Sequence, residues 1–126
     1  MADADTIVSA HALTTRQDIH ETARQLVSNL GPTLVALLSG SKDAKLPHRW
    51  SQADGPEPRP EARKRLMAAH RAWVIVSIPE SDYVARNWFI GANPRLGERS
   101  PAEALREGDI REVLAAADAF SEDTDG

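Results

Sequence analysis

The sequence contains no cysteine among its 126 residues, which excludes disulfide bonds and thiolate metal sites. It also has no apolar run near the roughly 20 residues that a membrane-spanning helix requires. Its beginning, from Met1 to Asp5, is acidic rather than basic, unlike a targeting segment. These absences predict a cytoplasmic protein that has no membrane partner.

Residue patterns typical of catalysis are also missing. The four histidines are scattered, and none pairs with another at metal-ligand spacing beside a carboxylate. His20 and Glu21 begin like a zinc-binding helix, but Arg24 stands where the second histidine would be needed. Ser39 and Lys42 match a Ser-x-x-Lys spacing only at the level of chance, and no glycine-rich phosphate loop is present. We expect a protein that is not an enzyme and that has neither a metal nor a cofactor.

What is present is a series of helical patterns separated by breaker residues. The length suits one compact domain, or two helical subdomains that share a core. The one strand candidate, residues 73–78, continues a segment whose apolar residues already recur at helical spacing. The sequence therefore predicts an all-α fold, in which a long helix joins a helix-turn-helix-like N-terminal half to a small helical C-terminal domain.

The N-terminal half holds three of these patterns. Residues 1–13 are weakly patterned and are expected to be a flexible N-terminus. Thr14 and Gln17 form a capping box, and the helix after it has an apolar face of Ile19, Ala23, Leu26, Val27 and Leu30. Gly31 ends this helix and Pro32 opens a short one, which stops near Gly40. A third helix is expected over residues 43–52, and the last two would form a helix-turn-helix.

The charge is uneven along the chain. Residues 40–73 hold eight Lys/Arg against four Asp/Glu, whereas residues 74–126 hold five against eleven. The basic part suits DNA phosphates and base edges, and the candidate DNA-binding residues are Lys42, Lys45, His48, Arg49 and Arg63. The alternative is a degenerate helix-turn-helix that has kept the fold and lost the DNA. Both interpretations stay open.

A long helix is expected over residues 61–78, after a proline-rich connector. One face carries Leu66, Ala69, Trp73 and Val76, and it is widened by Met67, Val74 and Ile75. A helix that is apolar nearly all round is buried on several sides, so this helix is expected to be the spine of the molecule. Trp50 and Trp73 are expected in the core. Pro79 ends the spine, and another helix runs to Trp88.

The last third begins with Trp88 and Phe89, which precede a cluster of turn-forming residues. Ser100 and Glu103 form a capping box around Pro101, and Gly108 ends this short helix. Asp109 caps a final helix, with an apolar stripe of Ile110, Val113, Leu114, Ala117 and Phe120.

This order resembles the toxin-binding domain of the Xre/MbcA/ParS family of bacterial antitoxins. The matching residues are Trp88, Asn93, Pro94, Leu96, Gly97, Pro101, Leu105, Gly108, Val113 and Leu114. The match covers the chain well after about residue 80 and extends more loosely back to about Leu30. Each of these residues also has a packing or capping role that any small helical domain would need, so the resemblance rather than the spacing favours the antitoxin.

The resemblance implies a type II antitoxin that binds a RES-domain toxin, an enzyme that consumes NAD, and that also represses its own operon. The last helix would cover the entrance of the toxin's active site. The candidate toxin-binding residues are Trp88, Asn93, Arg95, Arg99, Leu114, Asp118, Phe120, Glu122, Asp123 and Asp125. Phe120 would be an apolar anchor, and the acidic end would shield a cationic nucleotide pocket. The alternative is a disordered, solubilising tail.

The resemblance also implies association of antitoxins with each other and with the toxin. The expected organisation is a flexible segment (1–13), a helix-turn-helix-like domain (14–78) and a toxin-binding domain (79–126). Two other functions stay open. One is a DNA-binding regulator without a toxin, whose C-terminal half serves dimerisation. The other is a helical adaptor whose partner is unrelated to toxins.

Overall fold

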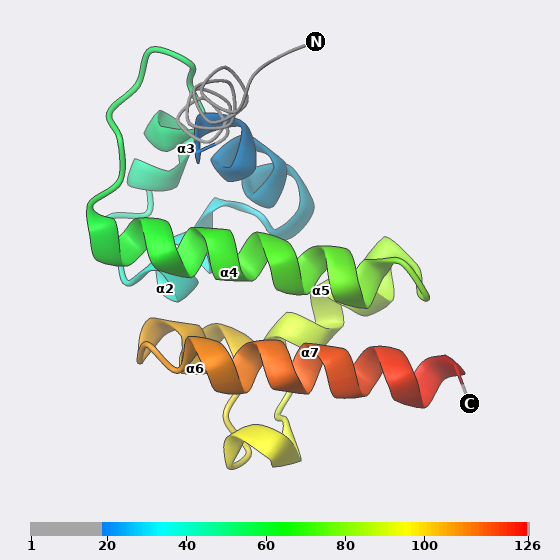
Figure 1. The fold of residues 1–126 in the computed structure, drawn as a ribbon. Helices are drawn as coiled ribbons and strands as arrows, with labels where there is room; N and C mark the ends of the chain where they lie inside the picture. Colours follow the sequence, from blue (N-terminus) through cyan, green and yellow to red (C-terminus); the bar gives the residue numbers. More distant parts are fainter. Residues whose placement is uncertain (1–18, 126) are drawn as a thin grey trace, which may run out of the picture.

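The computed structural model describes the backbone of residues 19–125 and the side chains of residues 19–123, and all regular elements in this part are helical (Figure 1). This confirms the predicted all-α fold. The capping box at Thr14 and the expected flexible N-terminus lie outside the described residues. The elements are a helix over residues 19–30, α2 (Pro32–Ser39), α3 (Leu46–Trp50), α4 (Pro60–Ser77), α5 (Asp82–Ile90), the 3-10 turn η1 (Pro94–Leu96), α6 (Pro101–Arg106) and α7 (Ile110–Asp125).

The long helix α4 is central. It packs against α2, α5, α6 and α7. In Figure 1, α4 and α7 lie side by side and run in the same direction, with α3 and the helix of residues 19–30 on the other side of α4. The observed bounds of α4 differ from the predicted ones by one residue at each end.

One continuous core joins the elements on both sides of residue 78. It contains Leu26 and Leu66 from the first part, and Phe89, Leu105 and Val113 from the second, all fully buried. Trp50 and Trp73 belong to this core, as predicted. The rings of Trp73 and Phe89 stack with their centroids 6.3 Å apart.

The width of the buried face of α4 was predicted wrongly. Met67 is 40% exposed and Val74 is 41% exposed, although both were expected to be buried. Ile75, the third residue of the widened face, is half-buried. Helical spacing identifies the apolar residues, but it does not tell which of them a neighbouring element covers. The described neighbours of α4 cover the side that carries Met67 and Val74 only in part.

The helix ends agree with the predicted capping signals. Gly40 and Gly108 both have left-handed backbone conformations, with φ of 86° and 88°. Behind each glycine, the next N–H donates to a carbonyl five residues back, from Ser41 to Ala36 and from Asp109 to Ala104. This pattern is the Schellman motif, which satisfies the free carbonyls of a helix end. Ser100 Oγ accepts from the N–H of Glu103, so the predicted cap of α6 is present.

Two arginines connect the end of α6 to its neighbours, one to α4 and the other to the end of α2. Arg65 on α4 donates from Nε to the carbonyl of Leu105 at 3.0 Å. Arg106 on α6 donates to the carbonyl of Leu37 at 2.9 Å and to that of Ser41 at 3.4 Å. The Leu37 and Leu105 carbonyls also accept from the N–H groups of Gly40 and Gly108, so each carbonyl is bonded twice at its helix end.

The third helix is shorter than predicted. It spans five residues, Leu46–Trp50, instead of residues 43–52. Side chains hold the chain in turns before it begins. The N–H of Asp43 donates to Ser41 Oγ, and the N–H of Lys45 donates to Asp43 Oδ1. Such local bonds offer the backbone an alternative to the helix. Pro47 lies in the first turn of α3, where no helical hydrogen bond is lost.

Candidate protein-docking site

A cavity of about 370 Å³ lies where the end of α5, the loop before η1 and the second half of α7 meet. We call it the α5–α7 cavity. Five of the ten candidate toxin-binding residues line it: Trp88, Asn93, Arg95, Phe120 and Asp123. Ala92, Pro94 and Ala116 complete the lining. The cavity thus joins residues that are up to 35 positions apart in the sequence.

Aromatic rings form the inner wall of the α5–α7 cavity. Trp88 packs edge to face against Phe89 with the ring centroids 5.1 Å apart, and it lies 6.4 Å from the ring of Phe120. Phe89 is fully buried, whereas Trp88 and Phe120 are half-buried. The buried ring therefore holds Trp88 in place and leaves part of the two outer rings available for a partner.

Asn93 shapes the loop beside these rings. Its Oδ1 accepts from the N–H of Arg95 at 2.9 Å, and its own N–H donates to the carbonyl of Arg99 at 3.0 Å. Its carbonyl accepts from Leu96 and Glu98. These bonds close the loop into the turn η1, which was not predicted. Asn93 therefore fixes the backbone from which the exposed Arg95 side chain projects.

The indole nitrogen of Trp88 has a feature that the sequence did not predict. Its Nε1 is buried and has no hydrogen-bond acceptor among the residues that the structure describes. Buried indole N–H groups usually have an acceptor, and an unpaired one is unfavourable by about 1–3 kcal/mol. The ring of Trp88 lines the α5–α7 cavity, but its Nε1 has almost no exposed surface, so this unpaired N–H is a cost borne inside the fold.

Arg99 is held by the chain itself and does not line the cavity. It donates from Nε to the carbonyl of Leu96 at 2.8 Å and from a terminal nitrogen to Asp109 at 2.6 Å, and it also pairs with Glu107. The bond to Asp109, then that to Glu107, raises the pKa of the guanidinium above its ordinary value. Arg99 thus braces the η1 loop against the start of α7.

The remaining candidates lie apart from the cavity. Leu114 lines a separate groove against α4. Asp118 and Glu122 are exposed on α7, outside the cavity lining. The side chain of Asp125 is outside the described residues. The backbone is helical through Asp125, so the acidic end continues the last helix instead of forming a separate tail.

The candidate DNA-binding residues divide in a similar way. Lys42, Lys45, His48 and Arg49 are all exposed, on the turn before α3 and on α3 itself. We call these four residues the basic corner. Arg63 is half-buried on α4 and lines the same groove as Leu114. With five residues, α3 is only about 7.5 Å long.

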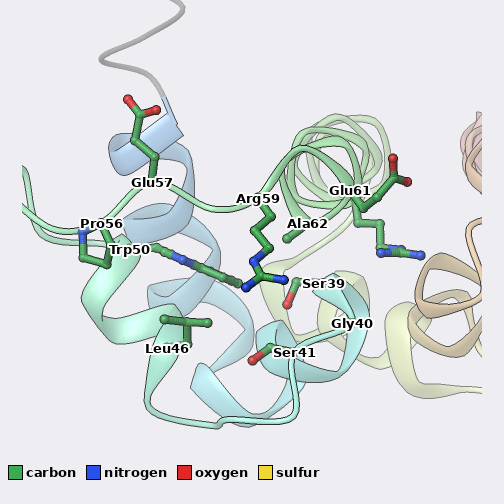
Figure 2. Close-up of a pocket in the computed structure, with 11 residues that line it drawn as sticks. Ser39, Gly40, Ser41, Leu46, Trp50, Pro56, Glu57, Arg59, Glu61 and Ala62 are labelled. Atoms are coloured by element: carbon green, nitrogen blue, oxygen red, sulfur yellow. The ribbon is translucent and has the colours of Figure 1, made fainter.

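Next to the basic corner lies a second cavity, of about 350 Å³, between α3, the proline-rich connector and α4. Figure 2 shows the Arg59 side chain pointing into it, toward Trp50 and Ser39. Arg65 also lines this cavity, and its Nε is bonded to the carbonyl of Leu105. The acidic residues Glu57 and Glu61 lie in the lining as well, so the cations here do not form a purely positive surface.

Comparison with known proteins adds no identification. The chain matches no family model, no curated protein and no solved structure. Within residues 19–125, no helix is long and apolar enough to cross a membrane.

Proposed function

We propose that the chain is a type II antitoxin, which binds and inhibits a RES-domain NAD-degrading toxin by covering its active site. The observation that carries the proposal is the α5–α7 cavity. Five of the ten residues that the family resemblance named for toxin binding, from α5, the η1 loop and α7, line one cavity. The chemistry of this cavity suits a protein partner, because tryptophan and arginine are enriched among residues that dominate binding energies.

The acidic end of α7 supports the same proposal. Glu122 and Asp123 are exposed in its last turns, where the helix macrodipole presents partial negative charge. A carboxylate there is unfavourable by about 0.3–1 kcal/mol. Cationic groups that hold the pyrophosphate of NAD would remove this repulsion and would pair with the carboxylates. The end of α7 thus gains more from a cationic cleft than a neutral helix end would.

The test is inhibition of the RES-domain enzyme encoded beside the gene. The wild-type chain is expected to restore growth on co-expression and to stop NAD loss in a purified mixture. Phe120→Ala is expected to weaken binding by about 2–4 kcal/mol, as truncation of a buried interface aromatic does. Tyr83→Ala is the matched control, because Tyr83 is an aromatic that is 71% exposed and lies outside the cavity.

Two results would overturn the proposal. One is a toxin that stays fully active with the wild-type chain in stoichiometric excess. The other is equal protection by the Phe120→Ala and wild-type chains, with both variants folded by circular dichroism. Absence of any such enzyme beside the gene would favour the regulator or the adaptor instead.

Repression of the operon is a second candidate function, and the basic corner favours it. Its four side chains are exposed and make no ion pair with any residue between 19 and 123. They are therefore available to phosphates. A gel-shift experiment at low salt with promoter DNA, with and without the toxin, tests this function. Absence of retardation in both mixtures removes it.

A further inference from the structure

A groove of about 560 Å³ runs between the first half of α4 and the beginning of α7. We call it the α4–α7 groove. Its apolar residues are Met67, Ala68, Ile110 and Leu114, and its polar residues are Arg63, Lys64, His70 and Arg71. None of the described residues that line it is acidic. The groove therefore combines an apolar floor with a basic rim.

Exposed apolar side chains continue this groove along α4. Met67, Val74 and Ile78 are 40%, 41% and 79% exposed. They are seven and four residues apart, which is the spacing of one helix face. Arg71 is also exposed and lies on the same face. From Lys64 to Ile78 this stripe is about 21 Å long, the length of a helix of about 14 residues.

The α4–α7 groove is separate from the α5–α7 cavity. Both use α7, but the groove takes Ile110 and Leu114, whereas the cavity takes Ala116, Phe120 and Asp123. Successive residues of a helix are about 100° apart, so the mean directions of the two sets differ by roughly 130°. A molecule in the groove would therefore leave the cavity open.

Two cations of the rim, Lys64 and Arg71, are available to a partner. Lys64 lies 3.7 Å from Glu61, but both side chains are about two-thirds exposed or more, at 66% and 72%, so this pair contributes little. Arg71 is exposed and forms no ion pair with another described residue. His70 is bonded to Gln25 Oε1 at 2.8 Å, which fixes this edge of the rim.

We propose that the α4–α7 groove binds an amphipathic helix of another protein, with acidic residues flanking its apolar face. The apolar side would cover Met67 and Leu114, and its carboxylates would pair with Lys64 and Arg71. Helices dock in such grooves through apolar residues at helical spacing. Nucleic acid would leave the apolar floor exposed to water, and a basic helix would meet like charge on the rim.

The first measurement uses a labelled helical peptide of about 15 residues, with leucines on one face and glutamates flanking them. Its fluorescence anisotropy is titrated with the full chain. Two control peptides carry lysines in place of the glutamates, or the same composition in scrambled order. We expect binding of the acidic amphipathic peptide alone, and we expect it to weaken as salt is added.

Charge-reversed variants test whether the peptide binds in the α4–α7 groove. Lys64→Glu with Arg71→Glu is expected to lower the affinity for the peptide by about tenfold or more, because both rim contacts become repulsive. Lys42→Glu with Arg86→Glu is the matched control, because it makes the same change of net charge outside the groove. Leu114→Ser is expected to weaken binding through the floor, and Phe120→Ala is expected to leave it unchanged, which separates this inference from the antitoxin proposal.

Several outcomes would overturn the proposal that the α4–α7 groove binds an acidic amphipathic helix. One is an acidic peptide that binds no more tightly than the scrambled one. Another is an equal loss of affinity in both charge-reversed variants, which would reflect net charge alone. Self-association in sedimentation that Lys64→Glu with Arg71→Glu abolishes would assign the groove to a second copy. Binding of duplex DNA that is lost in the same variant would assign it to nucleic acid.

Discussion

The α5–α7 cavity and the basic corner differ in how their side chains are held. In the cavity, a buried ring packs against Trp88, and the bonds of Asn93 fix the loop that carries Arg95. The basic corner is also formed by turns, but its cationic ends extend into solvent without partners among the described residues. The cavity is therefore preorganised for a shaped partner, whereas the corner offers charge without fixed geometry.

This difference has a consequence for the partners. A preorganised site loses little side-chain freedom on binding, so shape and apolar contact contribute to its affinity. Mobile surface cations act mainly on the rate of association and on binding that salt screens. The cavity is thus the better candidate for specific recognition, and the corner for an electrostatic contribution.

The strongest way to break the comparison is Phe89→Ala. Phe89 is fully buried, supports Trp88 and stacks on Trp73. Its truncation is expected to lower the free energy of unfolding by about 3–5 kcal/mol. Urea denaturation followed by circular dichroism measures this loss. Tyr83→Ala is the control and is expected to change stability by less than about 0.5 kcal/mol. A small effect of Phe89→Ala would mean that the cavity wall is not anchored in the core.

A smaller effect is expected from Asn93→Ala. The variant removes the Oδ1 acceptor of the Arg95 N–H and should destabilise the loop by about 1 kcal/mol. Hydrogen exchange of the Arg95 amide is expected to become faster. Asn93→Asp keeps an acceptor at the same place and should retain the slower exchange. Equal exchange in Ala and Asp variants would contradict the role given to Asn93.

The next variant, Glu122→Gln, has effects of opposite sign on stability and binding. Removal of a negative charge from the C-terminal end of α7 should stabilise the isolated chain by about 0.3–1 kcal/mol. If the chain is the antitoxin proposed above, the same change should weaken inhibition of the toxin, because the proposed contact with a cationic cleft would lose one carboxylate. Thermal unfolding and NAD consumption measure the two effects. Weaker inhibition together with lower stability would indicate a structural role instead.

The smallest effect on stability is expected in the basic corner. Lys42→Glu with Lys45→Glu should change the free energy of unfolding by less than about 0.5 kcal/mol, because both side chains are exposed and form no ion pair with another described residue. Chemical denaturation tests this. A larger loss of stability would show that the corner is as firmly built into the fold as the cavity.

Features that depend on local sequence were predictable. Gly40, Gly108 and Ser100 mark helix ends because their backbone or side chain satisfies groups that only a helix end leaves unpaired. The apolar residues that recur at helical spacing predicted both ends of α4 to within one residue. Local patterns did not show the late start of α3, where the N–H of Lys45 donates to the Asp43 side chain in a turn before the helix begins.

The site was predictable only in part. Trp88, Asn93 and Phe120 were named through the family resemblance, and their shared cavity depends on packing that periodicity does not describe. Arg99 was also named, but its bond to Asp109 is a contact between separate elements. The exposed stripe of Met67 and Val74 was missed because a sequence shows which residues are apolar, but not which ones lack a neighbour.

The bonds of Arg65 and Arg106 connect the end of α6 to α4 and to the end of α2. Moving α6 away from these two helices would remove the Arg65 donor from the Leu105 carbonyl and the Arg106 donor from the Leu37 carbonyl. Since Arg106 also reaches Ser41, at the start of the turn that carries Lys42 and Lys45, any tilt of α6 should draw that turn with it. We therefore expect a displacement of α6 to shift the end of α2 and the turn that follows it.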